Sequence, residues 1–473
     1  MKVRNPRTGE EDYAIAPLDG TALREVAADL RARQRAWAAL TPKARALRLS
    51  ETAAAIARHG DALAEALTAD TGRRAASLME VAGIGRMLAH WAARAPEVIA
   101  AVACGTRPSA TPGIAITPRL VPYPLVGVIS PWNFPLILAL IDAIPALAAG
   151  CAVLVKPSEV TPRFIRPLMA ALGEVADVPL ALVEGDGVSG AALVGVVDYL
   201  CFTGSVATGR KVAAAAAAAF VPVSLELGGK DPMIVLASAD PVAAAGIALR
   251  ASVVNAGQAC QSIERVYVAR AILAPFLDAL VTQAAAARLN AEDIGRGEIG
   301  PFIFARQAEI VQAQIDDAVA HGARVLAGGR VERHGGLWLR PTVLVDVTPD
   351  MAVMREETFG PVIPVTPFDS VEEALVLANA GEFGLSGAVI AGTTEEAEAV
   401  GARLEVGAVS INDGALTAMV WDAEKNSFGL SGMGPSRMGD SGLTRFFRRR
   451  SLLRQTGQAL PLAAYAEDAA REG

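Results

Sequence analysis

The sequence is poor in the residues that mark disulfide-rich and metal-binding proteins. It has 4 cysteines and 4 histidines among 473 residues, and neither set shows the close spacing of a disulfide framework or a zinc site. Aromatic residues make up only 5%, and the net charge of −7 offers no general attraction for nucleic acid. We therefore expect no bound metal, no nucleic-acid partner and a reducing compartment, namely the cytoplasm.

The sequence also lacks an uninterrupted apolar run of membrane-spanning length. The one candidate, residues 136–155, is broken by Asp142, Pro145 and Gly150, which favours a buried helix followed by a buried strand. The N-terminal segment MKVRNPRTGEEDYAI has no apolar core of the kind found in signal peptides. The arginine run at 445–454 is typical of a solvated face or an intersubunit contact. No membrane partner is expected.

The apolar segments that are present indicate an α/β protein with more than one domain, because the chain exceeds the length that one core supports. Ala and Leu recur at helical spacing through residues 20–100. From Val126, short apolar runs alternate with helical stretches, as in a parallel sheet covered on both faces. A second set of such runs after Lys230 predicts a second α/β domain, and the Pro and Gly turns of 104–124 predict a projecting hairpin.

Two potentially reactive side chains lie in apolar sequence. Cys260 is part of VVNAGQACQSIERVYV, and Glu226 ends the apolar run PVSLEL just before two glycines. A thiol attacks as its thiolate and needs help to ionise. A carboxylate among apolar residues loses hydration, which raises its pKa and suits it to take a proton from water. The pair predicts a nucleophile and a general base, although either residue taken alone is better explained as an inert core thiol or a salt-bridged acid.

Two segments compete as binding sites for a dinucleotide. VEGDGVSG satisfies the spacing GxGxxG at residues 185–190, but Asp186 would put a negative charge where a pyrophosphate has to lie. In CFTGS, an apolar strand is followed by a turn at Gly204 and by Ser205, which opens an Ala-rich helix. The free N–H groups and the dipole at that helix start attract phosphate, so we predict the phosphate site at CFTGS.

Further motifs follow in order: PWNFPLILALIDAIPALAAG around Asn133, VLVKPSEVTP, CFTGS, ETFGPV at 357–362 and FGLSG at 383–387. Together with LELGGK and GQAC, they resemble the aldehyde dehydrogenase superfamily, in its NAD(P)-dependent, non-acylating type, from NPRTGE near the N-terminus to about residue 455. The resemblance implies an α/β fold with a Rossmann-type parallel-sheet domain, a second α/β catalytic domain and a small β oligomerisation hairpin.

The resemblance also suggests how the chain divides. It implies a dinucleotide-binding domain at 1–103 and 125–229, a catalytic domain at 230–445, and an oligomerisation hairpin with a C-terminal strand and tail at 104–124 and 446–473. The hairpin would pair with a strand around residues 451–455 as a homodimer or homotetramer assembles.

For the reaction, the resemblance implies that an aldehyde is oxidised to its carboxylic acid on Cys260, through a thiohemiacetal and a thioester. The side-chain amide of Asn133 and the backbone N–H of Cys260 would stabilise the oxyanion. Glu226 would deprotonate the water that hydrolyses the thioester.

For the cofactor, Lys156 and Glu159 match the family positions that bind the adenosine ribose. A carboxylate there accepts hydrogen bonds from both ribose hydroxyls and repels a 2′-phosphate, so NAD is favoured, with NADP possible because Lys156 partly offsets the repulsion. Glu357 and Phe359 match the positions at the nicotinamide ribose and ring. The full set expected at the cofactor is Ile129, Pro131, Trp132, Lys156, Ser158, Glu159, Gly187, Gly204, Ser205, Leu227, Gly228, Glu357 and Phe359.

Several positions depart from the family pattern. Ile141 and Asp142 stand where relatives commonly have Trp and Lys, Cys151 replaces an Asn, Phe383 replaces a Tyr, and SFGLSGMGPSRMGDSG replaces the usual C-terminal motif. These changes leave the substrate mouth, and any proton route through that lysine, undefined. Apolar candidates favour a hydrophobic or aromatic aldehyde, although ordinary core packing explains them equally well. The candidate substrate residues are Phe134, Leu138, Ile141, Gln261 and Trp421.

Two alternatives stay open on the sequence. A coenzyme A-acylating semialdehyde dehydrogenase would also use Cys260, but such enzymes generally lack a carboxylate at the position of Glu226. A catalytically silent scaffold or binding protein on the same fold is the second alternative, which Cys260, Glu226 and Asn133 disfavour.

Overall fold

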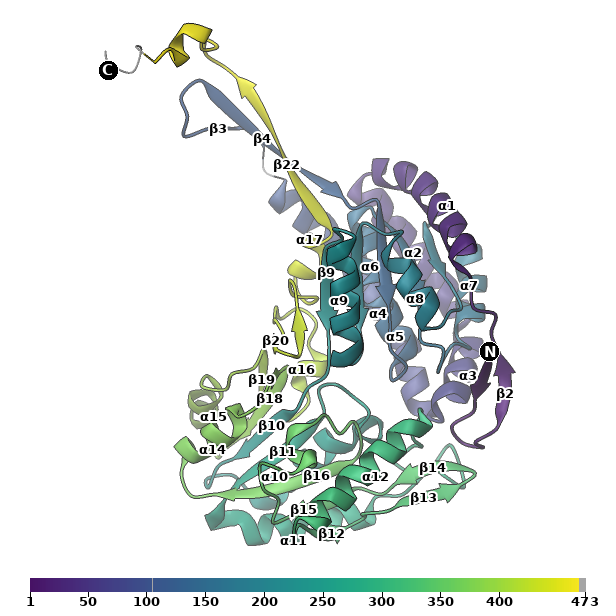
Figure 1. The fold of residues 1–473 in the computed structure, drawn as a ribbon, viewed down its shortest axis with the longest axis vertical. Helices are drawn as coiled ribbons and strands as arrows, with labels where there is room; N and C mark the ends of the chain where they lie inside the picture. Colours follow the sequence, from purple (N-terminus) through teal and green to yellow (C-terminus); the bar gives the residue numbers. More distant parts are fainter. Residues whose placement is uncertain (104, 468–473) are drawn as a thin grey trace.

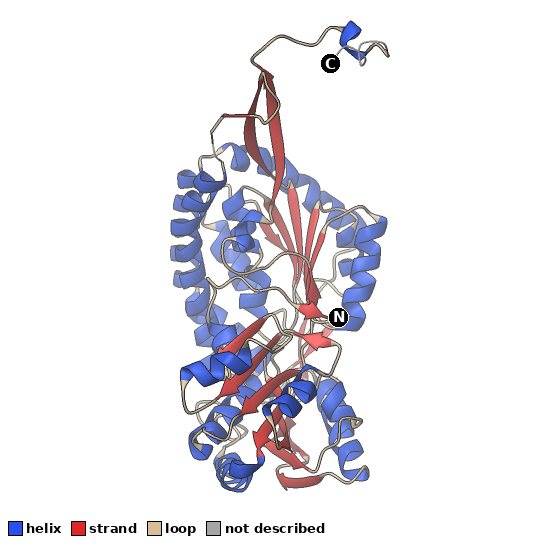
Figure 2. Ribbon diagram, turned by 90° about the vertical axis from the view of Figure 1, so that its left-hand side faces the viewer, coloured by secondary structure: helices blue, strands red, loops and turns tan. Residues whose placement is uncertain are grey.

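The computed structural model describes residues 1–103 and 105–467; Cys104, in the expected hairpin, and residues 468–473, in the expected tail, lie outside the described residues. Two sheet-containing domains and a projecting arm make up the molecule (Figure 1). Helices flank both sheets (Figure 2), as the near-continuous apolar strands of the sequence predicted.

The first domain is built on a six-stranded sheet in the order β21-β9-β8-β5-β6-β7. Its strands are β5 (Leu125–Ile129), β6 (Ala152–Lys156), β7 (Leu180–Leu182), β8 (Tyr199–Thr203), β9 (Val223–Glu226) and β21 (Gly432–Met433). The pairs among β5 to β9 are parallel, and β21 is antiparallel to β9. Because β6 and β8 lie on opposite sides of β5, the connections diverge at the crevice between β5 and β8, where α/β sheets bind their ligands.

Successive residues of these strands point to opposite faces, and each face has its own core. Val126 and Val128 pack in the cluster formed with α2 to α7, whereas Leu125 and Ile129 pack in the cluster formed with α1, α8 and α9. The helices are α1 (Gly20–Ala39), α2 (Pro42–Arg58), α3 (Gly60–Thr71), α4 (Arg74–Val102), α5 (Pro135–Leu140), α6 (Ala143–Ala149), α7 (Ile165–Gly173), α8 (Gly187–Val194) and α9 (Val206–Ala218). A small ribbon of β1 (Lys2–Arg4) and β2 (Glu11–Ala14) precedes them.

The second domain has a seven-stranded sheet in the order β12-β15-β16-β11-β10-β18-β19. Its strands are β10 (Asp231–Val235), β11 (Ile263–Ala269), β12 (Arg324–Ala327), β15 (Thr342–Val345), β16 (Val362–Phe368), β18 (Ser386–Ile390) and β19 (Ala408–Ile411). One face is covered by α10 (Pro241–Val253) and α11 (Leu273–Ala286). The other is covered by α12 (Ala305–Ala320), α13 (Ala352–Arg355), α14 (Val371–Asn379) and α15 (Thr394–Gly401).

Short elements connect these layers. They are η1 (Val254–Gly257), η2 (Arg270–Ile272), β13 (Val331–His334), β14 (Gly336–Leu339), β17 (Phe383–Gly384), α16 (Leu416–Met419), β20 (Phe428–Gly429), α17 (Ser441–Thr444) and η3 (Leu462–Tyr465). The chain returns to the first sheet at β21, before the boundary at residue 445 that the sequence suggested, because Gly432 and Met433 pair with Glu226 and Leu225.

The arm extends away from the first domain (Figure 1). It consists of β3 (Arg107–Pro108), β4 (Ile114–Pro122) and β22 (Phe447–Gln455), and β22 pairs antiparallel with β4 along its whole length. The pairing of the hairpin with a C-terminal strand is therefore present within one chain. In the part of the chain that the structure describes, no helix is long and apolar enough to cross a membrane.

Candidate active site

The candidate site lies at the carboxyl ends of the parallel strands of the first sheet. Ile129 ends β5, Thr203 ends β8 and Glu226 ends β9, and Thr203 stands opposite Glu226 in the ladder. Loops that leave these strands reach the same edge, which is why motifs far apart in the sequence meet there.

One cavity, of about 270 Å³, brings most of the predicted residues together. It contains two of the three predicted catalytic residues, Cys260 and Asn133. Glu226, the last residue of β9, directly precedes Leu227 and Gly228, which line the cavity. Thr203, Gln307 and Ile310 also line it and were not predicted. The predicted residues in its wall are Pro131, Trp132, Asn133, Leu138, Gly204, Ser205, Leu227, Gly228, Cys260, Glu357 and Phe359.

Cys260 follows an unusual turn. Asn255, Ala256 and Gly257 all have positive φ angles, of 60°, 54° and 70°. Left-handed conformations cost free energy for residues other than glycine and cluster at functional sites. A Cβ on Gly257 would lie 2.2 Å from the carbonyl group of Gly360, so only glycine allows the Cys260 turn to pack against the loop after Phe359.

The half-buried Cys260 thiol is in an acidic environment. Burial, together with the carboxylates of Glu357, Asp231 and Glu226, raises the pKa of Cys260 to about 12, and the guanidinium of Arg437 opposes this rise. A thiol with this pKa is protonated at neutral pH and needs a proton acceptor or a nearby cation to react. Glu226 is half-buried, and Ser427 Oγ donates to its Oε2 at 3.0 Å.

Asn133 sits on a loop that is fixed from several sides. Its backbone carbonyl accepts hydrogen bonds from Arg73 Nη2 and Asn255 Nδ2, both at 3.1 Å, and its own Nδ2 donates to Gln258 O at 3.0 Å. Glu80 accepts the N–H groups of Leu136 and Ile137 at the start of α5. The amide is thus held in place, with one of its two N–H groups engaged.

Glu357 and Phe359 are held by a buried ion pair that the sequence analysis missed. Lys230 Nζ lies 2.7 Å from Glu264 Oε2 and 2.8 Å from Thr358 Oγ1. Glu264 also accepts the backbone N–H groups of Thr358 and Phe359, both at 2.8 Å. The sequence did contain a signal for this pair. Glu264 lies inside the apolar run IERVYVA, and a glutamate buried in such a strand needs a partner of opposite charge.

The remaining predicted cofactor residues surround the crevice without lining this cavity. Lys156 Nζ pairs with Glu159 Oε2 at 2.9 Å, and Ile129 and Ser158 are buried beside them. Gly187 begins α8, where the Asp186 carboxylate already accepts the N–H groups of Val188 and Ser189. These two N–H groups at the start of α8 are therefore engaged within the chain. By contrast, Ser205 caps α9 and lies in the cavity.

These residues fit a dinucleotide. Gly204 and Ser205, at the start of α9, line the cavity, and a helix start is a favourable place for a phosphate. Trp132 and Phe359, with ring centroids 5.4 Å apart, form an aromatic wall. A Cβ on Gly228 would lie 2.5 Å from the Glu357 carboxylate, so only glycine, which has no side chain, fits at this position. Burial raises the pKa of Glu357 to about 8, so this group is ready to donate or accept a hydrogen bond near neutral pH.

A larger cavity of about 800 Å³ lies on the other side of the Asn133 loop. Phe134 and Trp421 line it, with Ile137 and Met419 as further apolar neighbours. Two predicted substrate residues lie elsewhere. Ile141 packs against the core of the first domain, because its helical turn points inward, and Gln261 lines neither cavity.

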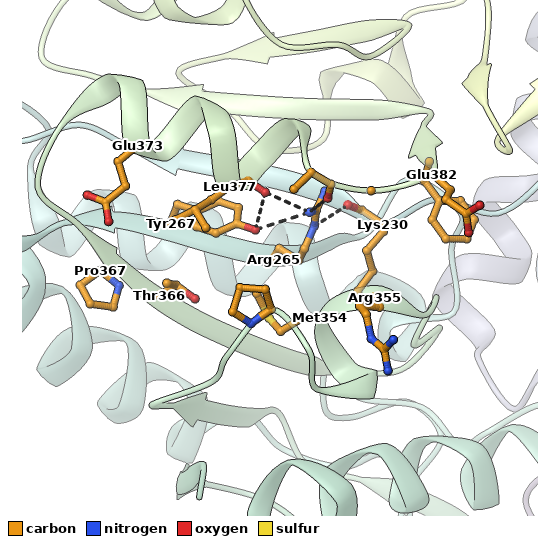
Figure 3. Close-up of a pocket in the computed structure, with 14 residues that line it drawn as sticks. Lys230, Arg265, Tyr267, Met354, Arg355, Thr366, Pro367, Glu373, Leu377 and Glu382 are labelled. Carbon is orange, nitrogen blue, oxygen red and sulfur yellow. Dashed lines mark hydrogen bonds between the residues drawn. The ribbon is translucent and has the colours of Figure 1, made fainter. Parts of the chain in front are cut away.

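A third cavity, of about 480 Å³, lies behind Lys230 and holds neither Cys260 nor Glu226 (Figure 3). The Arg265 guanidinium at its floor is engaged by the carbonyl groups of Lys230, Leu377, Ala378 and Ala380. The hydrogen-bond donors of Arg265 are therefore already engaged within the fold.

Residues 1–452 match the family described as "Aldehyde dehydrogenase family". The chain is 39% identical to a 4,4′-diapolycopene aldehyde oxidase of Methylomonas sp, over 85% of this chain and 78% of that protein. It is also 39% identical to a "putative succinate-semialdehyde dehydrogenase" of Mycolicibacterium smegmatis with NADP(+) in its name, over 89% of this chain and 82% of that protein.

Two solved structures of aldehyde dehydrogenases are similar to this chain over nearly its whole length. The structure of a "putative aldehyde dehydrogenase", PutA from Anabaena variabilis, superposes with a TM-score of 0.95 at 48% identity, covering 98% of this chain and 99% of that one. Betaine aldehyde dehydrogenase from Staphylococcus aureus, solved in complex with NAD+, gives a TM-score of 0.91 at 29% identity, covering 97% and 92%.

Proposed function

The chain belongs to the aldehyde dehydrogenase family, which oxidises aldehydes with NAD(P), and we propose that Cys260, Asn133 and Glu226 perform this reaction here. The observation that carries the proposal is the shared cavity, in which the Cys260 thiol and the Asn133 amide face the residues of the predicted cofactor site. Glu226 stands at its edge, at the end of β9.

The Cys260 thiolate attacks the aldehyde carbon. The free N–H of the Asn133 amide and the backbone N–H of Cys260 donate hydrogen bonds to the oxygen, which stabilises the negative charge that develops there. NAD(P), held by the residues of the predicted cofactor site, would supply the acceptor for the hydride. Loss of that hydride from the former aldehyde carbon re-forms the C=O bond and leaves a thioester on Cys260. Glu226 then takes a proton from water, the hydroxide adds to the thioester carbon, and the carbon–sulfur bond breaks to release the acid and the thiolate. An amide suits the Asn133 position because it donates without a charge that would trap the thiolate.

The test separates the two half-reactions. Cys260→Ala should abolish turnover, whereas Cys201→Ala, at a buried thiol outside the cavity, should not. Glu226→Gln should keep the first burst of NADH and slow the steady state, and Glu398→Gln, on the exposed side of α15, serves as the matched control. Equal loss of burst and steady state in Glu226→Gln would assign it a role other than thioester hydrolysis. Acyl-coenzyme A formed in place of acid, when coenzyme A is added, would favour the acylating alternative.

For the substrate, we propose an aldehyde with a hydrophobic or aromatic body. The larger cavity supports this, because Met79, Phe134, Ile137, Met419 and Trp421 give it an apolar wall. A second candidate is an aldehyde with an acid at its far end, since three arginines, Arg73, Arg74 and Arg86, also line the cavity. A panel of apolar, aromatic and carboxylate-bearing aldehydes of equal length, compared by kcat/KM, decides between them.

For the cofactor, we propose NAD in preference to NADP. The Glu159 carboxylate, held by Lys156 at 2.9 Å, suits the two hydroxyls of the ribose, and the ion pair leaves little positive charge for a 2′-phosphate. The ratio of kcat/KM for the two cofactors measures this preference. Glu159→Gln should move the ratio toward NADP.

We also propose that the arm joins copies of this chain into a homodimer or homotetramer. Leu452 and Leu453 on β22 are 49% and 70% exposed, which is unusual for neighbouring leucines on a strand. Native mass spectrometry gives the number of subunits. The free thiols of Cys151, Cys201 and Cys260 fit the reducing environment of the cytoplasm, which we propose as the location.

A further inference from the structure

Asp142 and the C-terminal segment, two of the places where the sequence departs most from the family pattern, are in direct contact. The Asp142 carboxylate, 1% exposed, accepts a hydrogen bond from Arg437 Nη2 at 2.5 Å and another from Arg445 Nη2. Both guanidinium groups are also buried, with side chains 8% and 1% exposed. One carboxylate balances one guanidinium, so the cluster keeps a surplus positive charge, which is costly unless further negative groups lie nearby.

Arg437 is the member of the cluster that reaches the candidate active site. Its Nη2 also donates to Thr203 Oγ1 at 3.0 Å. Thr203 lines the cavity that holds Cys260 and stands opposite Glu226 between β8 and β9. Arg445 bonds the same Asp142 carboxylate but, among the described residues, makes no hydrogen bond with Thr203.

The titratable groups that face Cys260 are mostly acids. Glu226 on β9, Asp231 on β10 and Glu357 in the loop after α13 each raise the pKa of Cys260 when ionised. Arg437 lowers it, and Lys425 is a second cation within electrostatic reach of Cys260 and Glu226. Lys425 Nζ is held by the carbonyl group of Thr417 at 2.7 Å, outside the cavity.

We propose that Arg437, oriented by Asp142, is a positioning residue that presents a buried positive charge to the cleft between Cys260 and Glu226. The proposal rests on the roles of those two residues proposed above. The cation stabilises the Cys260 thiolate before it attacks the aldehyde. Asp142 fixes the direction of the guanidinium, and Thr203 ties it to the strand end beside Glu226.

The test measures the reactivity of Cys260 without any cofactor. Iodoacetamide alkylation of this cysteine is followed by peptide mass mapping between about pH 6 and pH 9, below the pKa of the thiol. Arg437→Met should alkylate about tenfold more slowly at each pH, the result of a pKa rise of about one unit when the cation is lost. Arg437→Lys should keep most of the rate. Arg445→Met, which disturbs the same carboxylate, should alkylate like the wild type.

An unchanged rate in Arg437→Met, or equal slowing in Arg437→Met and Arg445→Met, would overturn the proposal. If Arg437→Met does not fold, as judged by circular dichroism, Thr203→Val decides, because it removes the anchor of Arg437 and keeps the side-chain shape. Slowing in Thr203→Val supports the proposal, and a wild-type rate overturns it. A Cys260→Ala variant that still turns over would instead refute the proposed function, so the two failures are distinguishable.

Discussion

The buried ion pair of Lys230 and Glu264 allows a sharp test of how the cofactor loop is held. Both side chains are 3% exposed, and Glu264 accepts two backbone N–H groups in addition to the lysine. Lys230→Met leaves a buried carboxylate without its cation, which costs about 3 to 5 kcal/mol. The double variant Lys230→Met/Glu264→Leu removes both charges, and replacing a buried pair by apolar groups is often neutral for stability.

Stability and cofactor binding should therefore separate in this series. Hydrogen bonds to a charged acceptor contribute about 1.5 to 3 kcal/mol each, so losing the two bonds to Thr358 and Phe359 loosens the loop by about 3 kcal/mol or more. If half of this is felt by the cofactor, the KM for NAD rises about tenfold, since 1.4 kcal/mol is a factor of ten. The double variant removes the isolated charge but leaves the N–H groups of Thr358 and Phe359 without their acceptor. It should therefore regain only part of the melting temperature lost in Lys230→Met, and its KM for NAD should be raised.

Differential scanning fluorimetry and NAD titration, with and without aldehyde, measure the two effects. A double variant with a wild-type KM for NAD would refute the view that Glu264 positions the loop that carries Glu357. A single Lys230→Met variant as stable as the wild type would show that the carboxylate is not isolated when the lysine is gone.

Three further predictions concern the turn, a buried acid and the arm. Gly257→Ala should cost about 3 kcal/mol or more and abolish the NADH burst, because of the positive φ and the 2.2 Å contact with Gly360, while Gly173→Ala, which meets nothing within 4 Å, should be silent in both assays. Burial raises the pKa of Glu357 from 4.5 to about 8, so the native state holds a proton that the unfolded chain has lost, and stability falls as the pH rises through this window. Glu357→Gln should flatten that fall in melting temperature between about pH 5 and pH 8, and an unchanged slope would place the titration on another group. Leu453→Asp should reduce the assembly seen by native mass spectrometry, and an unchanged mass would exclude this part of the arm from the interface.

The fold could be predicted from the sequence to a large extent because its signals are local. Apolar runs followed by Gly, Pro or Ser mark strand ends, as at β6 and β8, and the helix caps at Ser205 and Asp186 are read directly from neighbouring residues. The prediction of a phosphate site at the start of α9 in preference to α8 depended on the same local signals. Asp186 accepts two N–H groups at the start of α8, whereas Gly204 and Ser205 at the start of α9 line the cavity that holds Cys260.

The parts of the site that escaped prediction depend on contacts between distant segments. Lys230 and Glu264 support the Glu357 loop, and Arg73 and Glu80 support the Asn133 loop, each across a long stretch of chain. Only burial identifies such residues, and burial is a property of the folded chain. The substrate residues show the same limit, because Ile141 has the apolar character of a pocket residue but points into the core.

The dependence on contacts between distant segments is clearest at Asp142. Seen alone in the sequence, an acid in place of the usual lysine looks like the loss of a functional group, and the altered C-terminal segment looks like an independent change. The two are 295 positions apart, yet they form one buried ion cluster, and loss of Asp142 would leave the guanidinium groups of Arg437 and Arg445 buried without their carboxylate. Departures from a family pattern are therefore best interpreted in pairs, because a buried charge is tolerated only with its partner. If the cluster acts as one unit, Asp142→Asn should destabilise the chain strongly, because it leaves two buried guanidinium groups without an acid, whereas Arg437→Met leaves the pair of Asp142 and Arg445. The double variant should then lose less than the sum of the two single changes in the melting temperature. A double variant that loses the full sum would show that the two residues act separately.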